Sequence, residues 1–269
     1  MKVTVQKEGM TETNKRSNTV FKARYDKSLY DPSDVVEWGD MGSDISANHG
    51  NSLQAKQVAY LPDGSAMVHT DLSHFSITIE DAERQMVGYE ALKHIDPDRT
   101  IINRADISTN GFFANPVAPG VDAIDTSASE QNAVDRESFV DMAAAQVIIG
   151  NADVHQRNVR VDAAGNLIPS DLDRAGGDIQ AEWVGVLSQY QNTLDRTLGE
   201  LEKTASALRI ETAQRFRREV LEQAEQIATS LSEQTINDIE RDSATWNESM
   251  AHNIRSNIEA LRAGTVDLV

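Results

Sequence analysis

The amino-acid sequence predicts an α+β fold, with short strands in the first half of the chain and helices in the last third. From about residue 35 to 177, short β-like runs alternate with loops rich in Gly, Asn and Pro. Residues 181–261 contain no proline, and their apolar side chains recur at steps of three and four. Between the two patterns, residues 147–176 have the character of a helix end, a polar loop and a short hairpin. Together these patterns favour a β-rich N-terminal part joined to a helical C-terminal part.

The amino-acid composition limits the kinds of core, surface and active site that the chain can form. The chain has 269 residues, 39% of them hydrophobic, so it can bury a sizeable core. Acidic residues number 43 against 25 Lys and Arg, which gives a formal net charge of −18. With 8 lysines against 17 arginines, this resembles salt-adapted proteomes, in which an acidic surface stays soluble once salt screens its repulsion. The lack of Cys excludes disulfides, zinc fingers, iron–sulfur clusters and thiol catalysis.

The same composition narrows the expected partners and compartment. Nucleic-acid phosphates bind to basic patches, and only the run Arg215, Arg217 and Arg218 resembles one, which is better explained as a solvated helix face. No stretch approaches the ~20 apolar residues of a membrane helix. The polar first segment has no apolar core of a signal peptide. We therefore expect no nucleic-acid partner, no membrane insertion and a cytoplasmic location.

The N-terminal half is expected to contain an arm and a small β-rich domain. Residues 1–34 are polar and without periodicity, which predicts a loosely ordered arm or one edge strand. The small domain is expected to span 35–125. Within it, Pro62-Asp63-Gly64 is a hairpin signal between expected strands at 54–61 and 65–70. This part therefore predicts at least one antiparallel strand pair.

Helices are expected in five places. Acidic residues in the first turn and apolar residues at helical spacing predict a helix over 78–94. An apolar face predicts a second helix over 137–149, which ends at Gly150. In the expected C-terminal domain, 126–269, apolar seams run from Trp183 to Leu208, then from Phe216 to Leu231, and finally from Trp246 to Leu261.

The segment from 147 to 176 contains the candidate catalytic and metal-binding residues. A helix end is followed by a polar loop, the strand 159–161, a Gly-containing turn, a strand at 167–168 and a second acidic loop. Two polar loops at the two open ends of one short hairpin can converge on a single site. The side chains that they offer, Asp153, Asn158 and Asp171, are hard oxygen ligands of the kind that Mg²⁺ prefers.

This segment resembles the catalytic loop of protein kinases, in which an Asp and an Asn five residues later precede a hairpin and a metal-binding Asp. Asp153 and Asn158 have that step, and Asp171 follows 13 residues later. The local sequence GNADVHQRNVRV…GNLIPSDLDRAG is most similar to the corresponding segment of the atypical kinase-like families. These include the HipA-type toxin kinases and the phosphatidylinositol and actin-fragmin kinase-like groups.

The resemblance implies a two-lobed kinase-like fold that binds Mg²⁺ and ATP, and it implies a role for each matching residue. Asp153 would be the catalytic base or would position the acceptor hydroxyl, and His155 would brace the loop. Asn158 would bind Mg²⁺, and Asp171 would bridge the metal to the nucleotide phosphates. Asp173 would either assist as a second carboxylate or form a salt bridge near Arg174.

The upstream half follows the family order but departs from its pattern. Residues 39–52 would form the phosphate loop, and the hairpin and the helix 78–94 would follow. The family's nucleotide-binding Lys is missing, because Thr70 stands at its position, and Gln85 stands where the pairing Glu is often found. Lys56 on the first strand is a substitute candidate for nucleotide binding, and its partner would be one of two acidic residues, Glu83 or Glu90.

Three hypotheses follow from the sequence. The first is an active kinase that transfers the γ-phosphoryl group of ATP to a hydroxyl of a protein or a small molecule. The second keeps the fold but makes the chain a catalytically impaired pseudokinase that binds nucleotide. The third is a non-enzymatic helical interaction protein, in which the C-terminal helices bind a partner and the acidic loop is incidental.

Overall fold

The structure is a computed structural model, and it describes residues 35–40, 56–62, 66–71, 79–99, 106–107, 112–116, 120–182 and 192–266. Over these residues the protein is α+β and mostly helical, with two small antiparallel sheets, which confirms the α+β class. Contacts divide the chain into two units. The first comprises Met1–Ala47, Asn51–Ala82 and Asn103–Val117, and the second comprises Asn48–Gly50, Glu83–Ile102 and Ala118–Val269. The expected arm 1–34 lies outside the described residues.

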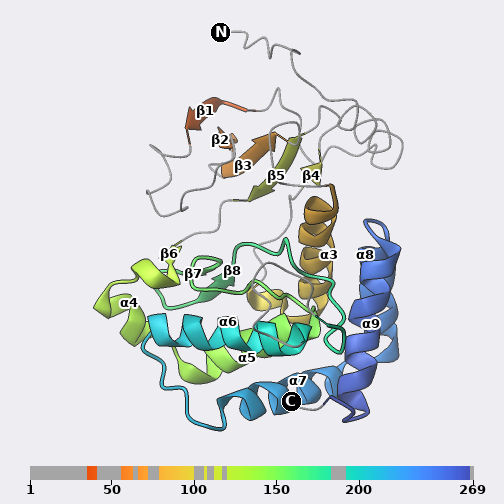
Figure 1. The fold of residues 1–269 in the computed structure, drawn as a ribbon. Coiled ribbons are helices and arrows are strands. Elements are labelled where there is room, and N and C mark those ends of the chain that lie inside the picture. The colour runs from red at the N-terminus through yellow and green to blue at the C-terminus, as the bar shows by residue number, and fades with distance from the viewer. Residues whose placement is uncertain are drawn as a thin grey trace. The chain divides into compact units, whose positions relative to one another are not determined.

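A five-stranded sheet forms the first unit (Figure 1). Its strand order is β1-β2-β3-β5-β4, and its strands are β1 (Glu37–Asp40), β2 (Lys56–Tyr60), β3 (Ala66–Asp71), β4 (Asp106–Ile107) and β5 (Phe112–Pro116). The hairpin β2–β3 confirms the predicted strand pair, with Lys56 opposite Thr70 and Tyr60 opposite Ala66. Ala59, Leu61 and Met67 are buried together in its core, and Val35 packs against them. The sequence did not predict strands β1, β4 and β5.

Helices dominate the second unit. Helix α3 (Ile79–Ile95) matches the helix predicted over 78–94, and from Glu83 onward it belongs to this unit. The other helices are α4 (Ala128–Ala133), α5 (Arg136–Ile148), α6 (Thr193–Ala207), α7 (Phe216–Ser230), α8 (Glu233–Ala244) and α9 (Glu248–Arg262), with the 3₁₀ turns Pro97–Arg99 and Ala123–Asp125. Helix α5 confirms the helix predicted over 137–149. No helix in the described part of the chain is both long enough and apolar enough to cross a bilayer.

Side-chain caps explain where several of these helices begin. Asp135, Asn192, Ser232 and Asn247 precede α5, α6, α8 and α9, and each side chain accepts a hydrogen bond from a backbone N–H of the first turn. The sequence did not predict α8, which separates the two long apolar seams at 216–231 and 246–261. Of the seam that begins at Trp183, the structure describes α6 from Thr193, and residues 183–191 lie outside the described residues.

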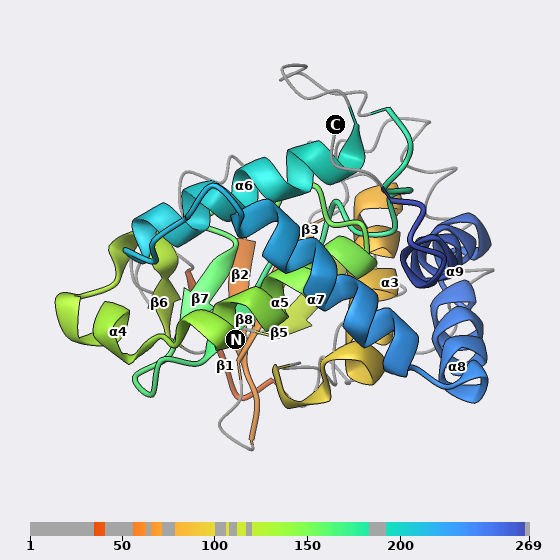
Figure 2. The same cartoon turned by 90° about the horizontal axis from the view of Figure 1, so that it is seen from below.

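The core of the second unit is built around α5, which packs against α7 and also contacts α6 and α9 (Figure 2). Phe139 of α5 and Phe216 of α7 are fully buried and stack with their ring centroids 6.1 Å apart. Every residue of α5 from Met142 to Ile148 is buried. This places the C-terminal end of α5 and the loop that follows it on a rigid support.

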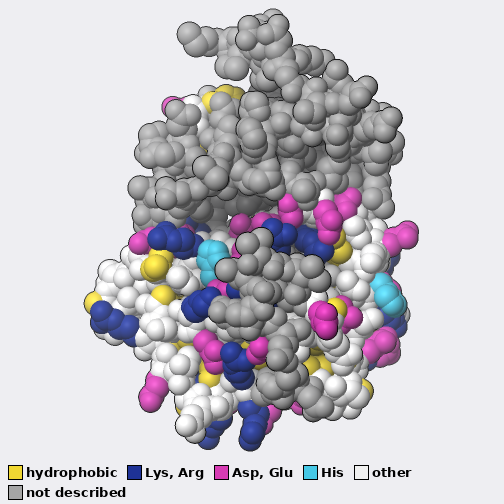
Figure 3. Space-filling model, in the orientation of Figure 1, with side chains coloured by type: hydrophobic (Ala, Val, Ile, Leu, Met, Phe, Trp, Pro, Cys, Tyr) yellow, Lys and Arg dark blue, Asp and Glu magenta, His cyan; other side chains and the backbone are white. Residues whose placement is uncertain are grey.

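The second sheet has the order β6-β7-β8, with strands β6 (Val121–Asp122), β7 (Val159–Val161) and β8 (Leu167–Pro169). The pair β7–β8 confirms the short hairpin that the sequence predicts, and β6 is an addition to it. On the face of the molecule in Figure 3, acidic and basic side chains of the described residues are interspersed. The described residues on that face therefore form no single continuous acidic patch.

Candidate functional site

The loops that follow α5 and β8 meet backbone against backbone. Gly150 ends α5 with a φ of +61°, and a Cβ at this position would lie 2.0 Å from the carbonyl oxygen of Gly177. The N–H of Gly176 donates to the carbonyl of Ile149 over 2.8 Å, and the N–H of Ala152 donates to the carbonyl of Arg174 over 3.4 Å. Close approach at Gly150 therefore brings residues 151–158 beside residues 170–177.

Asn151 is the side chain that joins the two loops. It is fully buried, and its Oδ1 accepts from the backbone N–H of Asp153 over 3.2 Å. Its Nδ2 donates to Gln146 Oε1 over 2.9 Å and to the carbonyl of Asp171 over 3.4 Å. Sequence reasoning missed this residue, although a polar side chain directly after the glycine that ends a buried helix is a signal that could have found it.

The loop after α5 brings Asp153 and Asn158 together. Asn158 Nδ2 donates to the carbonyl of Asp153 over 2.8 Å and to its carboxylate Oδ2 over 3.3 Å. Both bonds use the amide nitrogen, so the amide oxygen of Asn158 takes no part in them. The five-residue step thus closes the loop on itself and fixes both side chains.

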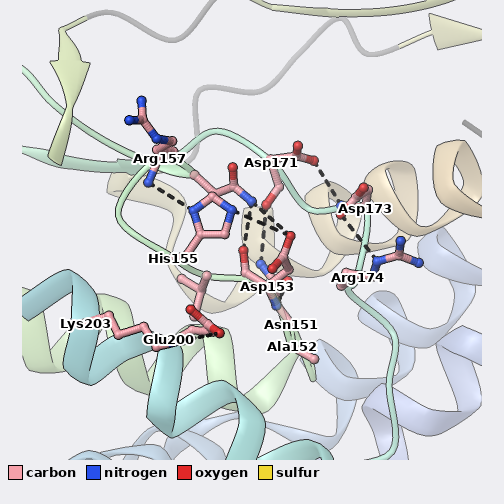
Figure 4. A network of polar contacts seen from close by, with 12 residues as sticks. Asn151, Ala152, Asp153, His155, Arg157, Asp171, Asp173, Arg174, Glu200 and Lys203 are labelled. Atoms are coloured by element: carbon pink, nitrogen blue, oxygen red, sulfur yellow. Dashed lines mark hydrogen bonds and ion pairs between the residues drawn. The ribbon is translucent and has the colours of Figure 1, made fainter. Parts of the chain in front are cut away.

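His155 lies in the same loop, beside Asp153 (Figure 4). Its Nε2 is 3.9 Å from Asp153 Oδ2, and its Nδ1 accepts from the backbone N–H of Arg157 over 3.1 Å. A ring nitrogen that accepts is unprotonated, so in the neutral ring Nε2 carries the proton and faces the Asp153 carboxylate.

The hairpin β7–β8 places Asp171 beside the loop that contains Asp153 and Asn158. In β7–β8, Val159 is opposite Pro169 and Val161 is opposite Leu167, and the N–H of Ser170 donates to the carbonyl of Asn158 over 2.9 Å. Asp171 Oδ1 accepts from the backbone N–H of Asp173 over 3.2 Å and from the side-chain amide of Gln85. Asp173 Oδ1 lies 3.9 Å from Arg174 Nε. Asp171 and Asp173 therefore lie in one turn, residues 170–177, which we call the acidic turn.

Two charged residues on α6 lie behind Asp153. Arg196 Nη2 is 3.7 Å from Asp153 Oδ1, and Arg196 Nε donates to the carbonyl of Ala152 over 3.3 Å. Arg196 Nη1 is 2.7 Å from Glu200 Oε1, which also pairs with Lys203. The side chains of Arg196 and Glu200 are 7% and 4% exposed. Sequence reasoning missed both, because an Arg and a Glu four residues apart are equally typical of an exposed helix face.

The upstream candidates are only partly described. Lys56 begins β2, but its side chain lies outside what the structure describes, as do residues 41–52 of the expected phosphate loop. Gly39 and Asp40 belong to β1. Glu83 accepts from Asn247 Nδ2 over 2.7 Å, and Glu90 forms an ion pair with Lys93. Both acidic residues that were considered as partners of Lys56 therefore have other partners.

A buried charge pair supports the hairpin from its far strand. Asp122 of β6 is opposite Arg160 of β7, and Arg160 Nη1 is 3.1 Å from Asp122 Oδ1. Both side chains are at most 3% exposed. Burial raises the pKa of Asp122 to about 6, against the opposing effect of Arg160, while Asp125 raises it further and Arg157 lowers it. Burial also lowers the pKa of Arg160.

The donor set of the site is one of hard oxygens. Asp171 and Asp173 supply carboxylates, and Asn158 supplies an amide oxygen, which together suit Mg²⁺ better than a softer metal. Over the described residues, no three or more His, Cys, Asp or Glu side chains form a group that could hold a metal ion. A cation at this site would therefore take part of its coordination from waters and from phosphate oxygens, as Mg²⁺ does.

Comparisons with known proteins give no relative for this chain. No family model matches its sequence, and neither a curated protein nor a solved structure matches it.

Proposed function

We propose that this protein is a two-lobed kinase-like protein that binds Mg²⁺ and ATP and transfers the γ-phosphoryl group to a hydroxyl of a protein or a small molecule. One observation carries the proposal: Asn158 bonds to Asp153, and the amide of Asn151 ties this loop to Asp171. In this proposal the five-stranded sheet belongs to the small lobe and the helical unit forms the large lobe.

The oxygen donors at the site support the choice of Mg²⁺. Asp171 and the amide oxygen of Asn158 would hold the ion, with Asp173 as a further carboxylate. When bound, the ion would neutralise charge on the nucleotide phosphates. The hydrogen bonds from Gln85 and Asp173 hold one oxygen of the Asp171 carboxylate, which orients this side chain before any ligand arrives.

Asp153 is suited to accept a proton from the attacking hydroxyl. The hydroxyl oxygen would form a bond to the γ-phosphorus as the bond from that phosphorus to the β,γ-bridging oxygen breaks, so ADP leaves and the proton passes to the Asp153 carboxylate. Asn158 holds Asp153 from within the loop, and Arg196 holds it from α6. Both contacts keep the carboxylate in one place, and positioning supplies much of the rate in phosphoryl transfer.

The test is transfer of labelled γ-phosphoryl from ATP, to the chain itself, to added cell proteins or to water, by the wild-type chain and by Asp153→Asn. We expect the wild type to exceed the variant by about 100-fold or more, since general base catalysis typically contributes about 10²–10⁴-fold. ATP binding should be the same in both, because Asp153 contacts the acceptor.

Binding of ATP without turnover in the wild type would instead identify a pseudokinase. Two observations favour this alternative. Gln85 stands where the resembled kinase family often has the pairing Glu, and its amide is bonded to Asp171 and Leu172. Thr70 stands where that family has its nucleotide-binding Lys. The two outcomes differ in the labelled product alone, since both require the nucleotide to bind.

A further inference from the structure

Helix α3 presents one face to the acidic turn that contains Asp171. Gln85 is 6% exposed, and both ends of its amide are used: Nε2 donates to Asp171 Oδ1, and Oε1 accepts from the N–H of Leu172 over 2.9 Å. One turn further along, a Cβ on Gly88 would lie 2.8 Å from Ala175 Cβ and 3.1 Å from Leu172 Cβ. Arg84 Nη1 donates to the carbonyl of Ala175 over 2.9 Å. The helix therefore lies directly on this turn.

The turn is also held from its other side. On α9, Asn253 Nδ2 donates to the carbonyl of Gly176 over 2.9 Å. Asn257 Nδ2 donates to the carbonyl of Gly177 over 2.9 Å, and its Oδ1 accepts from the N–H of Ile179 over 3.1 Å. The backbone after Asp171 is thus fixed independently of Gln85, so loss of the Gln85 amide would remove one hydrogen bond that orients Asp171 Oδ1 while the bond from the N–H of Asp173 and the turn stay in place.

From these contacts we infer that Gln85 is the positioning residue for the divalent cation, and that its neutral amide sets how tightly Asp171 holds that cation. This inference rests on the proposed function. Partners that hydrogen-bond to a metal-binding carboxylate fix its orientation, and their loss typically costs about 10–100-fold in metal affinity. A neutral amide also adds no negative charge beside Asp171, whereas a carboxylate in its place would attract a cation more strongly.

Two substitutions separate orientation from charge. Gln85→Met keeps the length of the side chain but removes both hydrogen bonds, so we expect Mn²⁺ affinity to fall about tenfold. Gln85→Glu keeps the acceptor for Leu172 and places a second carboxylate against Asp171. We expect this variant to melt at a lower temperature without metal, because like charges repel, and to gain more melting temperature from Mn²⁺ than the wild type does.

The measurement is calorimetric titration of Mn²⁺ into the full-length chain in high KCl, with melting temperatures taken with and without Mn²⁺. Asp171→Asn defines the specific site, since the heat that it loses belongs to Asp171. The matched control is Gln223→Met, which removes a comparable Gln-to-Asp hydrogen bond, from Gln223 Nε2 to Asp141 Oδ1 over 2.8 Å, between α7 and α5. We expect this control to bind Mn²⁺ as the wild type does.

The outcomes distinguish the inference from the function on which it rests. Opposite changes in Mn²⁺ stabilisation for Gln85→Met and Gln85→Glu support the positioning role. If both variants bind Mn²⁺ as the wild type does and differ from it only in melting temperature, Gln85 is merely structural and the inference is wrong. If the wild type has no Mn²⁺ site that Asp171→Asn removes, the proposed function fails and the inference fails with it.

Discussion

Arg196 joins Asp153 to the interior of α6, and the structure predicts that its removal is costly. Its guanidinium contacts Asp153, Glu200 and the carbonyl of Ala152 while the side chain is only 7% exposed. Breaking a buried charge pair from one side leaves the other charge without compensation. Here the remaining charge would be Glu200, which keeps only Lys203 of its two ion-pair partners.

We therefore expect Arg196→Met to lower the free energy of unfolding by about 3 kcal/mol and to reduce phosphoryl transfer in the molecules that remain folded. Urea denaturation measures the first effect. The matched control is Arg215→Met, since Arg215 and Glu219 have the same four-residue spacing but Arg215 is 76% exposed; its cost should stay below about 1 kcal/mol. Equal costs for the two variants would contradict the account.

Asp122 predicts a pH dependence of stability. Its pKa is about 6 in the folded chain against 3.8 for an exposed Asp, so the folded state binds the proton more tightly than the unfolded state does. This stabilisation is complete below about pH 3.8 and is lost as the pH rises to about 6. It amounts to at most about 3 kcal/mol.

Asp122→Asn should remove this contribution, since an amide does not titrate. We expect the difference in free energy of unfolding, wild type minus variant, to fall as the pH rises from about 4 to about 6 and to be constant above that range. Urea titrations at a series of pH values measure it. A difference that is independent of pH would show that Asp122 has an ordinary pKa.

Helix α3 determines where the acidic turn lies, and Gly88 is the residue that allows the close approach. An alanine in a helix interior is normally favoured over glycine by about 1 kcal/mol. At Gly88 the added Cβ would meet Ala175 and Leu172, so overpacking outweighs the gain. We expect Gly88→Ala to lower the melting temperature and to weaken Mn²⁺ binding by shifting the turn. Thermal melts and the same titration measure both, and a variant more stable than the wild type would contradict this packing.

The elements differ in how well the sequence predicts them. The hairpins at 56–71 and 159–169 were predicted because a turn signal marks each of them. Helices α3, α5, α7 and α9 were predicted because their apolar residues recur at helical spacing or because residues typical of a helix end mark their limits. Helix α8 was missed because its buried residues are few, Ile236, Ile239 and Ser243. Strands β4 and β6 are two residues long, too short for any alternation to be visible.

The site shows the same division. The hairpin pattern predicted that the loops with Asp153, Asn158 and Asp171 converge, but it did not predict the hydrogen bond from Asn158 to Asp153. It could not place Gln85 at Asp171, because 86 residues separate them and only the packing of α3 joins them. The resemblance assigned the Gln85 position to a lysine partner, and the structure assigns its amide to the acidic turn instead.

At the scale of the whole molecule, the net charge of −18 predicts a strong response to salt. Self-repulsion of like charges destabilises the folded state, and salt shortens the range of that repulsion to about 3 Å at 1 M. The surface ion pairs that salt also weakens contribute little each. We expect the melting temperature to rise between 0.05 and 1 M KCl, a ~20-fold increase in salt. It should rise less in a variant in which exposed acidic residues are replaced by neutral ones. A fall in melting temperature would contradict the salt-adapted interpretation.

The claim that a nucleotide and metal site is built on Asp171 is tested most directly by calorimetric titration of ATP with Mg²⁺ into the wild type and Asp171→Ala, in high KCl. Asp238→Ala, the same change of charge on α8, is the control. We predict binding to the wild type and to Asp238→Ala, and loss of binding in a folded Asp171→Ala. A folded wild type that binds no nucleotide, or an Asp171→Ala variant that binds it equally well, would contradict the account and leave the helical surface as the functional part of the molecule.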